Sequence, residues 1–102
     1  MGADLLEQVF LTAKSGVYEV LLVFESPAGA RERVTLTAPR GDDRAAVDFV
    51  ARHLALTGAT LARRPRLRVA SASGALRDDA ELLERLKVAV ARHGADGGAA
   101  ER

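Results

Sequence analysis

The strongest concentration of charge in the sequence is a run of arginines, Arg63, Arg64, Arg66 and Arg68, broken by Pro65. Guanidinium groups pair in a planar, bidentate manner with carboxylates and phosphates, so the run fits an acidic protein surface or a nucleic acid. In an extended strand, Arg66 and Arg68 would face solvent on the same side, which also suits a solvated strand edge. No aromatic residue interleaves with the run to stack on bases, so we rank a solvated strand edge first, a protein contact second and a nucleic acid third.

Two pairs of carboxylates, Asp42 with Asp43 and Asp78 with Asp79, precede stretches with helical periodicity. Aspartate is a preferred N-cap residue, because its side chain accepts a hydrogen bond from the first turn. Two carboxylates at a helix N-terminus would also repel an anion. We therefore interpret both pairs as helix caps and predict neither a phosphate site nor a metal site there.

The remaining residues with reactive side chains show no catalytic spacing. His53 and His93 lie near the ends of the predicted helices, and the chain contains no cysteine. The sequence has no glycine-flanked nucleophile and no glycine-rich phosphate loop. We predict no catalytic, cofactor-binding or metal-binding residues, and we rank an enzyme below a non-catalytic protein.

The composition is that of an ordinary globular domain. The chain has 102 residues, of which 48% are hydrophobic and 28% charged, and its formal net charge is +1. This charge gives no long-range attraction to polyanions. The absence of cysteine, of an apolar segment long enough to cross a bilayer and of a secretory leader indicates a soluble, cytoplasmic protein.

The segment from residue 4 to residue 14 has apolar side chains at helical spacing, and Asp4 fits an N-cap. We expect a short amphipathic helix here. The pattern leaves one alternative open, in which residues 9–14 form a strand.

Residues 17–25 and 31–38 form a predicted β-hairpin around the turn sequence Ser26-Pro27-Ala28-Gly29. The first strand of this hairpin is apolar on both faces, since Leu21 and Val23 alternate with the core-facing residues. We expect these two side chains to be covered, either by the N-terminal helix or by another protein chain.

The second half of the chain predicts two helices and a strand. A helix begins after Asp42 or Asp43 and ends at Gly58, a short strand covers residues 66–70, and a final helix ends near Gly94. We predict one domain over residues 1–93 and a flexible tail over residues 94–102.

The fold class predicted from these elements is α+β, in the order helix, strand, strand, helix, strand, helix. The strand-strand-helix-strand part, residues 17–70, resembles in its order the beginning of ubiquitin-like β-grasp domains. This resemblance implies a small sheet packed on helices, with a β-grasp-like core.

The function predicted from the sequence is a non-catalytic protein-interaction or regulatory module. Its partner is another protein or a second copy of the chain, and we expect no cofactor and no membrane contact. Two alternatives remain open: a small nucleic-acid-binding domain that uses the arginine run, and an accessory subunit of an enzyme on another chain. The candidate partner-binding residues are Leu21, Val23, Arg63, Arg64, Arg66 and Arg68.

Overall fold

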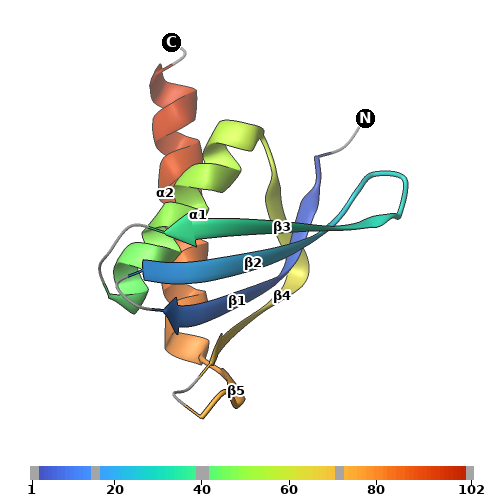
Figure 1. Cartoon of the computed structure of the whole chain (residues 1–102). Coiled ribbons are helices and arrows are strands. Elements are labelled where there is room, and N and C mark those ends of the chain that lie inside the picture. The colour runs from blue at the N-terminus through green and yellow to red at the C-terminus, as the bar shows by residue number, and fades with distance from the viewer. Residues whose placement is uncertain (1–2, 15–16, 39–41, 71–72, 101–102) are drawn as a thin grey trace.

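The computed structural model describes residues 3–14, 17–38, 42–70 and 73–100. Five strands and two helices are formed by these residues (Figure 1). In chain order they are β1 (Leu5–Lys14), β2 (Val17–Glu25), β3 (Arg31–Ala38), α1 (Asp43–Thr57), β4 (Thr60–Ala70), β5 (Leu76–Asp78) and α2 (Ala80–Ala100).

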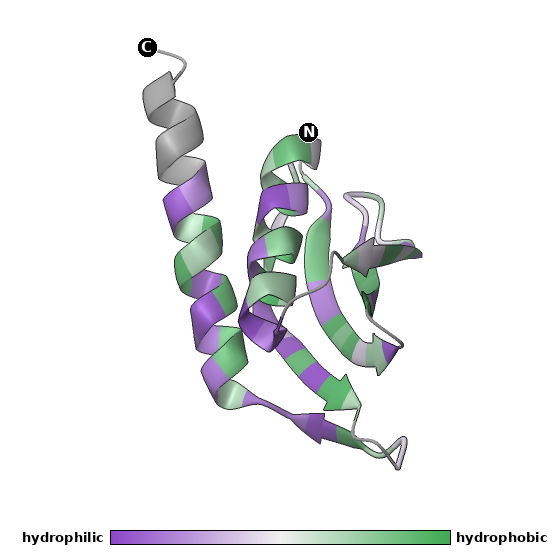
Figure 2. Ribbon diagram, turned by 60° about the vertical axis from the view of Figure 1, so that its left-hand side comes forward, coloured by the Kyte–Doolittle hydropathy of each residue, from purple (hydrophilic) through white to green (hydrophobic). Residues whose placement is uncertain are grey.

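The five strands form one mixed sheet in the order β3-β2-β1-β4-β5. Neighbouring strands are antiparallel except β1 and β4, which run parallel and are connected through β2, β3 and α1. Both helices lie on the same side of the sheet (Figure 2). Within the part of the chain that the structure describes, the other side of the sheet has no helix over it.

The helix predicted for residues 4–14 is wrong, because this segment is β1. It pairs with β2 from Lys14 opposite Val17 to Leu5 opposite Glu25, with a register shift between Leu6 and Gln8. The extra residue, Glu7, interrupts the alternation of side chains, as a β-bulge does. The buried residues Leu6 and Val9 are therefore three positions apart, which is a helical spacing, whereas the step from Val9 to Leu11 is that of a strand. The alternative interpretation, a strand over residues 9–14, is correct, and the strand already begins at Leu5.

The predicted order of elements is consequently wrong, although the α+β class agrees with the structure. Residues 17–70 do not form a β-grasp-like core by themselves, because β1 lies between β2 and β4 in the sheet. The sequence analysis also missed β5. Three residues are too few to show an alternating pattern, and β5 is held by pairing with β4, from Arg68 opposite Asp78 to Ala70 opposite Leu76.

The predicted hairpin between β2 and β3 is confirmed. The backbone N–H of Ser26 donates to the carbonyl of Ala30 at 2.7 Å, and that of Gly29 donates to the carbonyl of Ser26 at 2.9 Å. Gly29 has a φ of 89°, a conformation that favours glycine. The local turn chemistry was therefore sufficient to locate this element.

Both predicted helix starts are also confirmed. The Asp42 side chain accepts a hydrogen bond from the N–H of Ala45 at 2.9 Å, and that of Asp79 accepts one from the N–H of Leu82 at 3.0 Å. Helix α1 ends at Gly58 as predicted, with a φ of 77°. Helix α2 instead continues to Ala100, beyond the predicted end near residue 94. The flexibility predicted for residues 94–102 stays a prediction, and residues 101 and 102 lie outside the described part.

The hydrophobic core fills the space between the sheet and the two helices. Each strand from β1 to β4 contributes alternate side chains from its helix-facing side. An ion pair of 3.2 Å between Asp48 of α1 and Arg85 of α2 joins the helices at the surface. The buried residues of the core are Leu6, Val9, Leu11, Val20, Leu22, Phe24, Ala38, Ala46, Val47, Val50, Ala51, Leu54, Leu67, Leu82, Leu86 and Ala89.

Two leucines of α1 provide a matched test of this core. Leu54 is 1% exposed, whereas Leu56 is 80% exposed. We expect Leu54→Ala to lower the free energy of unfolding by about 2 to 5 kcal/mol through the cavity that it leaves. Leu56→Ala should change it by no more than about 0.5 kcal/mol. Chemical denaturation measures both values, and equal effects of the two substitutions would contradict the packing described here.

Candidate functional site

The open face of the sheet, meaning the side without described helices, carries an apolar strip across β1 and β2. Phe10 of β1 lies opposite Leu21 of β2, and Gln8 lies opposite Val23. Phe10 and Leu21 are half-buried, and Val23 is 8% exposed because its neighbours on the same face shield it. The N-terminal helix that we expected as one possible cover for Leu21 and Val23 is β1, and no described helix covers them; cover by another protein chain stays a prediction.

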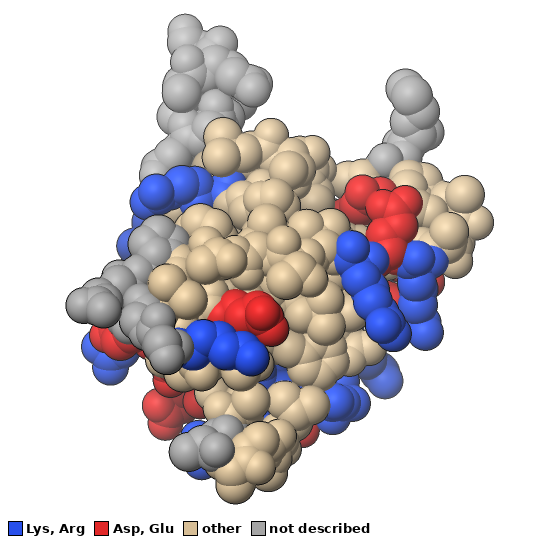
Figure 3. All heavy atoms as spheres, viewed as in Figure 1, with Lys and Arg blue, Asp and Glu red and all other residues tan. Residues whose placement is uncertain are grey.

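A cleft of about 540 Å³ lies over this strip. Its lining combines the apolar side chains with two arginines of β3, and no acidic residue belongs to it. The lining residues are Gln8, Phe10, Leu21, Val23, Arg31 and Arg33. The strands lie in front of the helices in Figure 1, and the same view in Figure 3 shows an extended uncharged surface with acidic and basic side chains both within it and at its margins.

The two arginines of the cleft differ in their partners. The Nε of Arg31 donates to Oε1 of Glu7 at 3.1 Å, and this carboxylate is supplied by the bulge in β1. Arg33 forms no ion pair with any described residue, and its side chain is exposed. The cleft therefore has one guanidinium group whose charge is not balanced by a neighbour.

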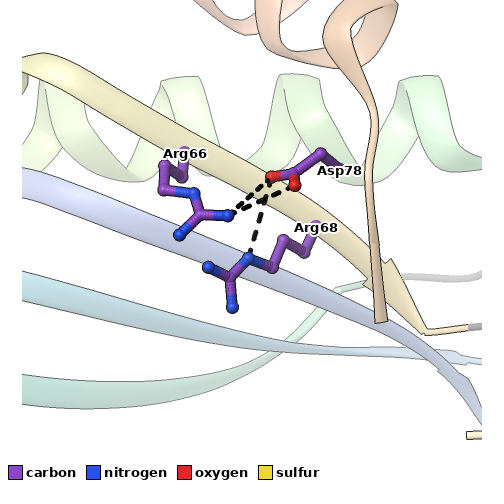
Figure 4. A network of polar contacts seen from close by, with 3 residues as sticks. All are labelled: Arg66, Arg68 and Asp78. Carbon is purple, nitrogen blue, oxygen red and sulfur yellow. Dashed lines mark hydrogen bonds and ion pairs between the residues drawn. The ribbon is translucent and has the colours of Figure 1, made fainter. Parts of the chain in front are cut away.

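The predicted arginine run is divided by the structure. Arg66 and Arg68 both bind Asp78 of β5: Nη2 of Arg66 lies 3.2 Å from Oδ2, and Nε of Arg68 lies 3.7 Å from Oδ1 (Figure 4). The guanidinium carbon of Arg68 also lies 5.6 Å from the centre of the Phe10 ring, within the range of a cation–π contact. These two arginines extend the open face beside the apolar strip.

Arg63 and Arg64 lie apart from this arrangement. In the pairing of β4 with β1, Leu61 is opposite Leu6 and Arg66 is opposite Gln8. The four residues 62–65 of β4 therefore lie between these two pairs, where β1 has the single residue Glu7. Arg63 and Arg64 therefore belong to an irregular, exposed part of β4. The structure joins Leu21 and Val23 in one cleft and adds Arg66 and Arg68 to the same face, but it does not bring Arg63 and Arg64 into the cleft.

Sequence reasoning missed Phe10, Arg31, Arg33 and Asp78 as parts of this face. The strand interpretation of residues 9–14 would have placed Phe10 outward, because it alternates with Val9 and Leu11. The alternation of apolar and polar residues in β3 places Arg33 on the side away from Val34 and Leu36, but it does not reveal its position beside Leu21 and Val23. Asp78 was taken for a helix cap, and no local signal pairs it with β4.

A second cleft, of about 710 Å³, lies where the N-termini of α1 and α2 meet. It is lined by Tyr18, Asp42, Asp43, Arg44, Asp79, Glu81, Leu82 and Arg85. Asp42 and Asp79 cap the two helices, and the Tyr18 hydroxyl donates a hydrogen bond to Asp43. Among the described residues, no group of three or more histidines and carboxylates is arranged to hold a metal ion.

Comparison with known proteins does not assign a function to either cleft. No protein-family model matches the sequence, and neither a curated protein nor a solved structure matches the chain. Over the described residues, neither helix combines the length and the apolar character needed to cross a membrane. The function is therefore argued from the geometry of the two faces of the sheet.

Tyr18 provides a direct test of the second cleft. The hydrogen bond to Asp43, burial and the charge of Asp43 raise the pKa of Tyr18 from 10.0 to about 12. Because the pKa is raised in the folded state, the stabilisation is complete below pH 10 and is lost as the pH rises through about 12. The chain contains one tyrosine, so the phenolate absorbance of the native protein reports this group alone.

We expect the native titration to have its midpoint near pH 12 and to return toward 10 in Asp43→Asn. The wild type should lose stability between pH 10 and about 12, whereas Tyr18→Phe should not show this loss. A native midpoint near 10 in the wild type would contradict the described contact.

Proposed function

We propose that this protein is a non-catalytic protein-interaction module that binds a segment of another protein on the open face of its sheet. The observation that carries this proposal is the cleft over Phe10, Leu21 and Val23, together with Arg33, which forms no ion pair with a described residue. The partner segment that fits it combines apolar side chains with at least one carboxylate.

The chemistry of the cleft supports an apolar partner. Burying the exposed parts of Phe10 and Leu21 would contribute about 25 cal/mol for each Å² of apolar surface removed from water. Aromatic and arginine side chains are enriched among the residues that carry binding energy at protein interfaces, and both line this cleft. A partner with an apolar side chain over Phe10 and Leu21 would use this surface most fully.

The charges of the cleft support an acidic partner. Glu7 already neutralises Arg31, and Asp78 neutralises Arg66 and Arg68 in part. Arg33 is left to pair with a ligand, and a guanidinium group binds a carboxylate through two parallel hydrogen bonds. A carboxylate beside the apolar residue of the partner would therefore reach Arg33.

A nucleic acid is less well supported as the ligand. Arg66 and Arg68 share one carboxylate, which weakens their attraction for phosphates. Phe10 is the aromatic side chain that lines the cleft, and the guanidinium group of Arg68 already lies over its ring. Proteins that bind single strands usually combine a basic groove with aromatic side chains on which successive bases stack. Here Asp78 pairs with Arg66 and Arg68, and Arg68 covers the Phe10 ring.

Selection from a library of random peptides displayed on phage tests this proposal without a known partner. We expect enriched peptides that carry an aspartate or glutamate next to a bulky apolar residue. Their binding should weaken by about 10-fold or more in Leu21→Asp and in Arg33→Glu, since each change places a carboxylate in the cleft. Calorimetry with one synthetic selected peptide measures the affinities.

Val88→Asp is the matched control, because Val88 is a 56% exposed apolar residue on α2, on the helical side of the sheet. It should bind the peptide as the wild type does. Peptides without acidic residues, or binding that is insensitive to both substitutions in the cleft, would contradict the proposal. So would a single-stranded oligonucleotide that binds more tightly than the peptide at about 150 mM salt.

A further inference from the structure

The two edges of the sheet are protected to very different degrees. An exposed strand edge presents unpaired N–H and C=O groups, and proteins usually block such an edge with short strands, bulges, charges or proline. One edge of this sheet has several of these features, and the other edge, along β3, has few. The difference identifies β3 as a surface for backbone pairing.

The edge at β4 and β5 is blocked. β5 contains only Leu76–Asp78, and beyond it β4 is irregular between Leu61 and Arg66, where Pro65 lies. The carbonyl of Leu67 accepts a hydrogen bond of 3.1 Å from the N–H of Asp79, at the start of α2. Another strand has no regular ladder to join on this side.

The edge at β3 is regular. This strand has eight residues, contains no proline, and pairs with β2 without a register shift from Ala38 opposite Tyr18 to Arg31 opposite Glu25. Among the described residues, no hydrogen bond reaches β3 from its outer side. Arginine and glutamate protect the first half of the strand, whereas the second half, Thr35 to Ala38, carries no charge.

The hairpin turn shows which backbone groups of β3 point outward. The N–H of Ser26 donates to the carbonyl of Ala30, so these two residues form a hydrogen-bonded pair. Hydrogen-bonded and non-bonded pairs alternate along an antiparallel ladder. The backbone groups of Val34 and Leu36 therefore point toward β2, and those of Arg33, Thr35 and Thr37 point away from the sheet.

The side chains on the helix-facing side of β3 are incompletely covered. Val34 and Leu36 pack against the core but remain partly exposed, whereas Val20 and Leu22 of the neighbouring β2 are 0% exposed. A strand added beside β3 would cover Val34 and Leu36 further if it brought apolar side chains to the same face.

We propose that β3 pairs antiparallel with β3 of a second copy of this chain, with Thr35 of both copies on the two-fold axis. In this register Val34 lies opposite Leu36 of the second copy, so the partly exposed apolar residues cover one another. Arg33 lies opposite Thr37, and Glu32 lies opposite Ala38. The outward backbone groups of Arg33, Thr35 and Thr37 all find partners.

Neighbouring registers fit less well. Centring the pair on Val34 places Glu32 opposite Leu36, and centring it on Arg33 brings the two Arg33 side chains together. Centring it on Leu36 shortens the paired segment to residues 34–38, because β3 ends at Ala38, and leaves the outward backbone groups of Arg33 without a partner in the strand. A two-fold axis between adjacent residues would set outward backbone groups against inward ones, which antiparallel pairing excludes. The sequence of β3 thus favours one symmetric arrangement with a second copy, and the isologous contact closes as a dimer.

Substitution of Thr35 by proline tests this interface without removing a bond from the β2–β3 ladder, because the N–H of Thr35 points outward. We expect the wild type to form a dimer with a dissociation constant between about 1 μM and about 1 mM, because an interface made by one strand from each copy is small. Thr35→Pro should weaken the association by about 10-fold or more, whereas Thr35→Val, which keeps the N–H, should not. Sedimentation equilibrium measures the masses, and the circular dichroism spectrum of Thr35→Pro checks its fold.

Cysteine cross-linking tests the register independently, because the natural chain contains no cysteine. In Thr35→Cys the two Cα atoms would lie about 5.5 Å apart, within the range for a disulfide. In Thr37→Cys they would be offset by about 13 Å along the strands. Mild oxidation should therefore yield covalent dimers of the first variant and not of the second.

A wild type that stays monomeric up to about 1 mM would overturn the proposal. A dimer that withstands Thr35→Pro, or equal cross-linking of both cysteine variants, would overturn it as well, because the contact would then lie elsewhere. The inference does not rest on the proposed function. Leu21→Asp changes the cleft and leaves the β3 edge in place, so failures of the two proposals are distinguishable.

Discussion

The pairing of β1 on both of its sides is the constraint on which the rest of the structure depends. β1 bonds antiparallel to β2 and parallel to β4, and a parallel neighbour requires a crossover that carries the chain back along the sheet. Helix α1 belongs to this crossover, and α2 packs beside it on the same side of the sheet. The apolar residues of β1 that face the helices are therefore buried, while Phe10 is left on the side that no described element covers.

The elements that were predicted correctly depend on residues close to them in the chain. Asp42 and Gly58 delimit α1 through bonds within one turn, and the β2–β3 hairpin follows from the four residues of its turn. The identity of β1 depends instead on partners far away in the sequence. Its bulge at Glu7 removes the alternation that would have marked a strand, so the local pattern favoured a helix. Pairing with β2 and β4 overrides this preference.

The candidate site was predictable only where it depends on neighbours in the chain. The two-sided apolar character of β2 separated Leu21 and Val23 from its core-facing residues, but the N-terminal helix offered as one possible cover for them is β1. Alternation placed Arg66 and Arg68 on the same side of their strand. The position of Phe10 between these two groups requires the order β2-β1-β4, which the sequence does not reveal. Asp78 was interpreted as a helix cap because its role depends on β5, a strand that exists only by pairing with β4.

The open face and the open edge of the sheet meet at Arg33, but they use different atoms of that residue. Side chains of a strand stand perpendicular to the sheet, whereas its backbone bonds lie within the plane. The guanidinium group of Arg33 therefore belongs to the cleft, and its N–H and C=O belong to the edge. A ligand in the cleft and a second chain along β3 would not compete for the same groups. In the symmetric dimer both open faces would lie on one side of a continuous sheet, so two clefts would be presented to one partner.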